Sequence, residues 1–363
     1  MNKVKSLYIH IPFCDSICDY CDFTKLLYNE KFAKDYLKTL KRELEHYSPF
    51  FVETIYVGGG TPTSLPTDEL VELLEMIKEY SNNVKEYTFE ANPENLTIEK
   101  LSILRKYGVN RLSIGVQTTD DRISKLINRG HSFAQVKKAV DEARKIGFDN
   151  INVDLIIGLP NVSKSMFQRD LENVVSLEVD HISCYSLTVH PNTVFYNKNV
   201  HEPTPEFARE LYDFAHEFLD KNGYVHYEIS NWSKPGKMSL HNLTYWKNEN
   251  YYGIGLGASG YLNNKRYKNT SNIQKYGVLD FIDETEEVNL NDLRTYQLLT
   301  NLRTIFGLDL DKFKKTFNED LLETKKNEVY ELIKEKLIAV EENTIKPTYD
   351  GMMVLDQILL KLI

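Results

Sequence analysis

Short β-rich runs alternate with helical stretches over the first half of the chain, and this alternation constrains the fold more than any other feature. The runs are "SLYIHI", "TIYVGGG", "EYTFEA", "RLSIGVQ", "INVDLII" and "HISCYS". Amphipathic segments such as "FAKDYLKTLKRELEHY" separate them. Strands that alternate with helices form a parallel sheet with right-handed crossovers. Six strands before about residue 190 therefore predict an α/β fold, a partial (β/α)6 TIM-like barrel, with functional groups at the C-terminal ends of its strands.

The chain changes character near Glu286. The segment "EVYELIKEKLIAVEENTIKPTYDGMMVLDQILLKLI" reads as helix, short hairpin and helix. This order predicts two domains, a core over residues 1–285 and a small, mostly helical, winged-helix-like domain over residues 286–363. Winged helices often bind nucleic acid, but residues 286–363 contain no dense Lys/Arg face. We interpret this domain as a lid or a partner surface.

Composition indicates the class of protein and its cellular compartment. The chain has 363 residues, 42% of them hydrophobic and 27% charged, which is typical of a soluble globular protein. The net charge of −9 argues against nucleic acid as a partner. No apolar run approaches the roughly 20 residues of a membrane-spanning helix, and Pro12 interrupts the apolar start before a signal-peptide core forms. We expect a cytoplasmic protein, in which clustered cysteines are more often metal ligands than disulfides.

Three of the four cysteines lie in "FCDSICDYCDF" with the spacing C-x3-C-x2-C. Cysteine thiolates hold iron–sulfur clusters, and Cys14, Cys18 and Cys21 on a [4Fe–4S] cluster leave one iron open to another ligand. The alternative is a structural zinc site completed by a histidine such as His10. Cys184 lies far away in "HISCYS" and is interpreted as a small buried hydrophobe on a strand.

Polar residues and glycines stand where the predicted strands end. The glycine-rich loop 58–62 follows the second strand, and its free N–H groups would suit a carboxylate end of a ligand. Glu90 and Gln117 end the next two strands, Arg129 stands after Gln117 in "NRGH", and Asp154 lies in the apolar run of the fifth strand. Each could be a structural polar residue or part of a simple turn. Their succession at strand ends favours a common binding site.

The cysteine spacing in a loop after a first strand resembles that of radical S-adenosylmethionine (radical SAM) proteins. The motifs "YIHIPFC", "GGGTPT", "FEANPE", "SIGVQ", "NRGH" and "VDLIIGLP" together resemble the oxygen-independent coproporphyrinogen III oxidase family. The resemblance implies a [4Fe–4S] cluster on Cys14, Cys18 and Cys21. It also implies that SAM binds the open iron and is lined by Tyr8, Tyr20, Gly59, Gly60, Thr61, Glu90, Gln117, Arg129 and Asp154.

Three features are similar to the haem chaperone branch of that family. Phe23 stands where the oxidase branch has a further cysteine, and only 13 residues precede Cys14 where that branch has a long segment. Residues 241–246, "HNLTYW", fit the H-N-x-x-Y-W motif that the branch associates with haem. We expect this hexapeptide in a loop between Gly236 and Gly253. There His241 would offer an imidazole to haem iron and Tyr245 and Trp246 would offer flat faces to the porphyrin, with Asn242 beside them.

The resemblance implies a haem chaperone that delivers haem to an acceptor apoprotein. It further implies an electron donor such as flavodoxin or ferredoxin, and a peripheral membrane contact made through the acceptor. Coproporphyrinogen oxidase activity is not expected. Two alternatives stay open, namely decarboxylation of coproporphyrinogen III and radical SAM chemistry on another substrate. Each residue of the hexapeptide, taken alone, is weak evidence for a haem site, because a lone histidine is usually solvated or structural.

Overall fold

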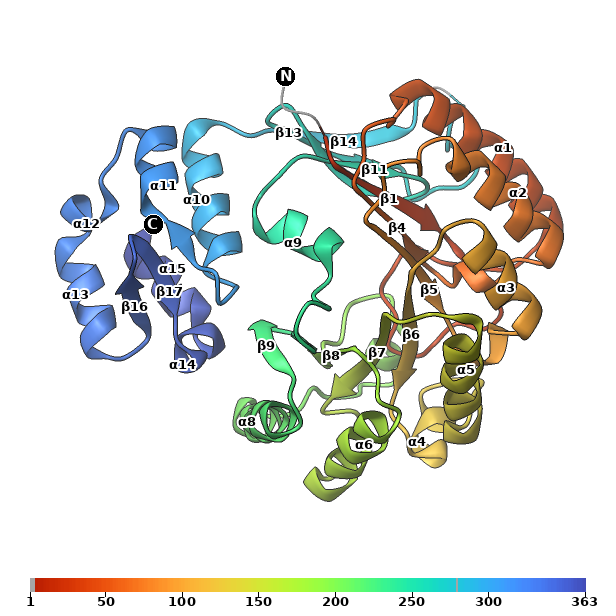
Figure 1. Ribbon diagram of the computed structural model, residues 1–363, viewed down its shortest axis with the longest axis horizontal. Helices are drawn as coiled ribbons and strands as arrows, with labels where there is room; N and C mark the ends of the chain where they lie inside the picture. Colours follow the sequence, from red (N-terminus) through yellow and green to blue (C-terminus); the bar gives the residue numbers. More distant parts are fainter. Residues whose placement is uncertain (1–3, 279) are drawn as a thin grey trace.

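The computed structural model describes residues 4–278 and 280–363. Its main element is a 12-stranded sheet whose central strands are parallel neighbours (Figure 1). The six strands predicted from the sequence are all present in this order, which confirms the partial barrel. They are β1 (Ser6–Ile11), β4 (Thr54–Gly59), β5 (Glu86–Ala91), β6 (Arg111–Gln117), β7 (Ile151–Ile157) and β8 (His181–Ser186).

Helices connect the parallel strands and cover the outer face of the sheet (Figure 1). Their ends follow local sequence signals. The Ser132 hydroxyl and the Gln135 side chain form a capping box at the start of α5, and Gly147 ends that helix with a left-handed φ of 99°. The connecting helices are α1 (Glu30–Tyr47), η1 (Pro62–Ser64), α2 (Thr67–Lys78), η2 (Pro93–Asn95), α3 (Ile98–Lys106), α4 (Asp121–Leu126), α5 (Phe133–Ile146), α6 (Lys164–Ser176), α7 (Val194–Asn197) and α8 (Pro205–Lys221).

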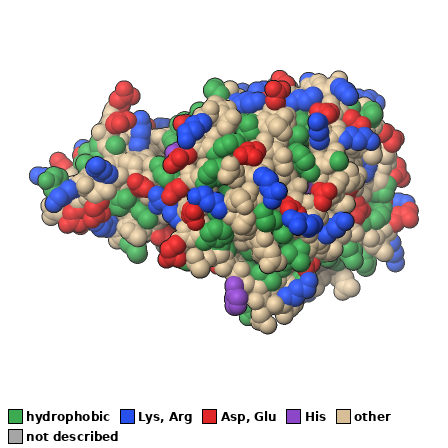
Figure 2. All heavy atoms as spheres, turned by 90° about the horizontal axis from the view of Figure 1, so that it is seen from below, with side chains coloured by type: hydrophobic (Ala, Val, Ile, Leu, Met, Phe, Trp, Pro, Cys, Tyr) green, Lys and Arg blue, Asp and Glu red, His purple; other side chains and the backbone are tan. Residues whose placement is uncertain are grey.

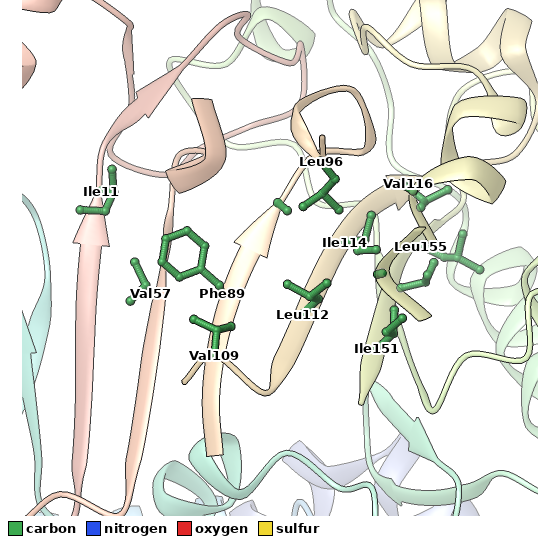
Figure 3. Packing of buried hydrophobic residues seen from close by; sticks show 14 of the residues in the cluster. Ile11, Val57, Phe89, Leu96, Val109, Leu112, Ile114, Val116, Ile151 and Leu155 are labelled. Atoms are coloured by element: carbon green, nitrogen blue, oxygen red, sulfur yellow. The ribbon is translucent and has the colours of Figure 1, made fainter. Parts of the chain in front are cut away.

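The two faces of the parallel strands have different chemistry because side chains alternate along a strand. The outer face is apolar and packs beneath the helices, as Val57, Phe89 and Leu112 show (Figure 3). The inner face is polar and largely closed to solvent. It begins at the N-terminal ends of the strands with Ser6, Thr54, Glu86, Arg111 and Asn152, all of them buried. Polar groups of that kind are stable inside a protein only when they have hydrogen-bond partners.

Additional strands extend the sheet at both edges. β11 (Tyr251–Ile254) pairs in parallel with β1, and β12 (Ser259–Leu262), β13 (Lys265–Asn269) and β14 (Ile282–Glu287) continue it antiparallel. The segment "NNKRYKN" forms the hairpin between β12 and β13. At the other edge lie β10 (Asn231–Ser233) and β9 (Val225–Glu228), and a separate pair joins β2 (Phe13–Cys14) to β3 (Leu26–Leu27). The predicted boundary between residues 285 and 286 falls inside β14.

The C-terminal domain has its own core, which includes Leu298, Phe313 and Ile345. A three-stranded sheet of order β15-β17-β16 packs with helices around it, in the helix, hairpin and helix order expected from the sequence. Its elements are α10 (Leu290–Asn301), β15 (Leu308–Asp309), α11 (Leu310–Phe317), α12 (Leu321–Thr324), α13 (Lys326–Lys334), β16 (Ile338–Glu341), β17 (Thr344–Pro347), α14 (Tyr349–Met353) and α15 (Leu355–Leu362).

The surface carries mixed charges. On the face shown in Figure 2, Lys and Arg side chains are interspersed with Asp and Glu. Among the residues that the structure describes, no helix combines the length and apolar character needed to span a membrane.

Candidate functional site

The cysteine loop follows β1 and is held against the glycine-rich loop. Cys14 is buried, whereas Cys18 and Cys21 are partly exposed. The Thr61 hydroxyl lies 3.7 Å from the Cys14 Sγ and the Arg129 Nη1 lies 3.3 Å from the Cys18 Sγ. Burial raises the pKa of Cys14 to about 11, so a metal would have to displace its proton. Hydrogen-bond donors beside sulfur suit thiolates in the ligated form.

The histidine of the zinc alternative does not join these thiols. The Nδ1 of His10 lies 2.9 Å from the Tyr8 hydroxyl, and its Nε2 lies 2.7 Å from the Thr24 carbonyl oxygen. Within residues 4–278 and 280–363, no three His, Cys, Asp or Glu side chains are grouped around a single-ion site. Cys184 is fully buried on β8, as predicted for a small hydrophobe.

A cavity of about 430 Å³ opens beside the cysteine loop at the C-terminal ends of the strands. We call it the strand-end cavity. It brings together most of the residues singled out in the sequence: Cys14, Tyr20, Cys21, Gly59, Gly60, Thr61, Glu90, Gln117, Arg129 and Asp154. Tyr8 is the exception among the predicted SAM residues, because it lines a different cavity; its ring centroid lies 6.1 Å from that of Tyr56, which does line the strand-end cavity.

Two carboxyl groups give the strand-end cavity its charge. Glu90 accepts hydrogen bonds from the Gly59 amide at 2.9 Å and from the Tyr56 hydroxyl at 2.7 Å. Burial raises its pKa to about 7. Asp154 accepts from the Asn152 amide at 2.8 Å, and burial raises its pKa as well. A ligand that brings positive charge would offset the cost of ionising both groups.

Arg129 is the buried cation of the site. Its guanidinium donates to the Asn92 side chain at 2.9 Å and to the Gly115 carbonyl. A Cβ added at Gly115 would lie 2.8 Å from Nη2 of Arg129, so the glycine makes room for this side chain. Gln117, at the end of the same strand, has a left-handed φ of 69°. Non-glycine residues rarely adopt this conformation, and it changes the direction of the Gln117 side chain at the end of the strand.

The glycine-rich loop differs from the expectation of free N–H groups. The Gly60 amide donates to the Ile11 carbonyl at 2.9 Å, the Thr61 amide to the Phe13 carbonyl at 2.7 Å, and the Gly59 amide to Glu90. A Cβ on Gly59 would lie 2.5 Å from the His10 ring. The glycines therefore allow close packing between this loop and the cysteine loop, and their amides are already used there.

The sequence analysis missed some residues of the strand-end cavity. Tyr56, Asn92 and Ser113 all line it. Tyr56 could have been found from the alternation along its strand, which puts it on the inner face with Thr54. Asn92 stands in the quoted motif "FEANPE" and links Arg129 to the Thr61 hydroxyl, to which its amide donates at 3.2 Å.

The hexapeptide "HNLTYW" forms a helix, α9 (Leu240–Trp246), and not the expected loop. It lies between the barrel strands and the C-terminal domain (Figure 1). The Ser239 hydroxyl caps it, and the carboxylate of Glu86 accepts from the Leu240 amide at 2.8 Å and the His241 amide at 2.9 Å. A buried carboxylate at a helix N-terminus stabilises even a short helix.

His241 is fully buried at the N-terminal end of the barrel. Its Nδ1 lies 2.9 Å from the Thr54 hydroxyl and its Nε2 lies 2.7 Å from the Tyr245 hydroxyl. Burial lowers its pKa to about 3, so the imidazole is neutral. Both ring nitrogens therefore have hydrogen-bond partners, whereas the sequence predicted an imidazole offered to haem iron from a loop. Asn242 is partly exposed.

A second cavity, of about 730 Å³, lies between α9, the β11–β13 edge and α10. We call it the edge cavity. Six aromatic side chains line its wall: Tyr8, Phe23, Tyr245, Trp246, Tyr251 and Tyr296. Asp22 and Phe23 also line the strand-end cavity, so one short stretch of the cysteine loop borders both.

Comparison with known proteins agrees with this architecture. Residues 8–174 match the model of the radical SAM superfamily, and residues 288–354 match that of the HemN C-terminal domain. The fold is similar to coproporphyrinogen III oxidase (HemN) from Escherichia coli, with a TM-score of 0.86 and 24% identity over 99% of this chain and 90% of that one.

Curated relatives cover nearly the whole chain. The haem chaperone HemW of Bacillus subtilis is 37% identical over an alignment of 369 positions, which covers 97% of this chain and 97% of the relative. That of Escherichia coli is 36% identical over 262 residues, 70% of this chain and 69% of the relative. With this extent of similarity, the barrel and the C-terminal domain described above place the chain in the HemW haem chaperone family of radical SAM proteins.

Proposed function

We propose that this protein is a haem chaperone that binds haem together with a [4Fe–4S] cluster and SAM, and that passes the haem to an acceptor apoprotein. The observation that carries the proposal is the aromatic edge cavity of about 730 Å³ beside α9, in a chain whose relatives along 97% of its length are named haem chaperones. Its size is within the roughly 300–1,000 Å³ of cofactor sites. Aromatic faces suit a porphyrin ring.

The strand-end cavity supports the cluster and SAM part of the proposal. Cys14, Cys18 and Cys21 would hold the cluster, and Glu90 and Asp154 would favour the cationic groups of SAM. When bound, the cluster would supply an electron to SAM, itself received from a donor such as flavodoxin or ferredoxin. A membrane would be reached only through the acceptor protein.

The position of His241 suggests an order of events for haem. Tyr245 and Trp246 line the edge cavity, whereas His241 lies behind the Tyr245 hydroxyl, which occupies its Nε2. We propose that haem first packs against Tyr245 and Trp246. His241 becomes an axial ligand only when the Tyr245 hydroxyl gives up its hydrogen bond. A neutral imidazole is the form that binds iron.

The test is a haem titration followed by the Soret band. Wild type should bind haem, His241→Gln should shift the band, and Tyr245→Phe should give the imidazole-ligated spectrum at lower haem concentration. The iron content of the cluster should be the same in all three proteins. Wild type that binds no haem would contradict the proposal, and anaerobic conversion of coproporphyrinogen III by the same preparation would replace it with the oxidase function.

A further inference from the structure

One end of the edge cavity carries hydrogen-bond donors that have no partner. Arg266 on β13 lines this end, with its guanidinium stacked between two rings at 4.7 Å from the centroid of Tyr261 and 4.2 Å from that of Tyr296. Its one hydrogen bond among the described residues joins Nη2 to the Asn248 Oδ1 at 3.1 Å. The Arg266 Nε is buried and unpartnered.

Two further donors, on residues that line the same cavity, are in the same condition. The Asn248 Nδ2 and the Trp246 Nε1 are buried without a partner in the part of the chain that the structure describes, and both residues line the cavity. Buried polar groups are rarely left unpaired, because each costs free energy that a hydrogen bond would recover. All three orphaned groups are N–H donors, so the missing partner is an acceptor.

The stacked guanidinium defines what kind of acceptor fits. Arginine is the side chain that binds a carboxylate through paired N–H groups, and the two rings hold its plane in place. The two carboxylates that line the cavity either pair with another side chain or face solvent. Asp22 lies 3.4 Å from the His190 Nε2 and Glu249 is exposed. Among the described residues that line the cavity, Arg266 is the one Lys or Arg side chain, so a ligand carboxylate is favoured beside it.

We propose that Arg266 and Asn248 bind a propionate of the tetrapyrrole whose ring lies against the aromatic wall. This inference rests on the proposed haem-binding function and assigns the residues that orient the ligand. The propionate would accept from the Arg266 guanidinium and the Asn248 amide, and the ring would extend past Trp246 toward Tyr245.

The experiment is a binding cycle with two probes, haemin and haemin dimethyl ester, in which both propionates are blocked. Arg266→Gln should weaken haemin binding about tenfold, the usual scale for a lost charge-assisted hydrogen bond. It should leave binding of the ester unchanged. Arg266→Lys, which keeps the charge, should lose less. Asn248→Gly keeps the left-handed backbone at this position (φ 54°) and should weaken haemin binding a few-fold.

Lys268→Gln is the matched control, because Lys268 is an exposed cation on the same strand that does not line the edge cavity. It should bind both probes as wild type does. An Arg266→Gln variant that still binds the ester normally has kept its cavity, so its loss of haemin binding is not a folding defect. If wild type binds haemin and ester equally and Arg266→Gln changes neither, the propionate site is wrong while haem binding stands. If wild type binds neither probe, haem binding itself fails and the propionate site with it.

Discussion

The two ends of the barrel carry the two sequence motifs, the cysteine loop and the hexapeptide, in opposite states. At the C-terminal ends of the strands, the thiols of Cys18 and Cys21 are partly exposed beside a cavity of about 430 Å³. At the N-terminal ends, His241 is fully buried and both of its ring nitrogens have partners. One end is arranged to receive a ligand, and the other is closed by α9.

The partners of α9 explain the closed end. Ser6, Thr54 and Glu86 are the first residues of β1, β4 and β5, and each bonds to α9 or to its cap. In a parallel barrel this end usually serves stability and the opposite end serves chemistry. A motif residue at the N-terminal end therefore has a structural role. A ligand that binds it must replace one of its existing hydrogen bonds.

The largest effect is expected at the open end. Replacing Cys14, Cys18 or Cys21 with Ser should abolish binding of the proposed [4Fe–4S] cluster, because each thiolate would be the protein ligand of one iron. Iron and sulfide analysis after anaerobic reconstitution measures this directly. Cys184→Ser is the control and should keep the cluster at the wild-type level. Equal loss in the control would show that the three cysteines are not the ligands.

At the closed end, His241→Ala should destabilise the fold. The change leaves the Thr54 and Tyr245 hydroxyls without their buried partner, so the free energy of unfolding should fall by about 2–4 kcal/mol. Denaturant unfolding provides the measurement. Asn242→Ala is the neighbouring control, and its partly exposed side chain should change stability by about 0.5 kcal/mol or less. Were both variants as stable as wild type, His241 would have no structural role.

A smaller effect of pH is expected from Glu90. Its pKa is 4.5 in the unfolded chain and about 7 in the fold, mainly because of burial. As pH rises from about 4.5 to 7 the unfolded chain releases the proton first, so this group lowers the stability of wild type across that range. Glu90→Gln should therefore gain about 1–2 kcal/mol over wild type between pH 4.5 and pH 8, after allowance for screening.

The measurement is the difference in unfolding free energy between the two proteins at several pH values. Glu43, whose pKa burial also raises to about 7, is common to both proteins and cancels in this difference. A difference that does not change with pH would mean that Glu90 ionises normally in the fold.

Much of the open end could be predicted from the sequence, for physical reasons. Parallel strands put their C-terminal ends at one edge, so the cysteine loop, Glu90, Gln117 and Asp154 had to meet there once the alternation of strands and helices was recognised. Tyr8 differs from them, because its position on β1 alone does not show which cavity its ring lines. Here it points to His10 and the edge cavity.

The closed end could not be predicted in the same way. Helix α9 is only 7 residues long, too short for its period to be read, and the flanking glycines indicated a loop. What stabilises it is Glu86, which is distant in the chain and becomes its capping carboxylate only in the folded barrel. Local sequence carries no trace of that contact, apart from Ser239 as a capping residue.

The stretch that borders both cavities, Asp22 and Phe23, has a thermodynamic consequence. A ligand that repositions Phe23 from one cavity changes the affinity of the other cavity for its own ligand. Such linkage is reciprocal: the factor by which the first occupant alters the second equals the factor by which the second alters the first. Because the exposed ring of Phe23 is a wall of both cavities, a ligand in the strand-end cavity and a ligand in the edge cavity would each change the affinity of the other.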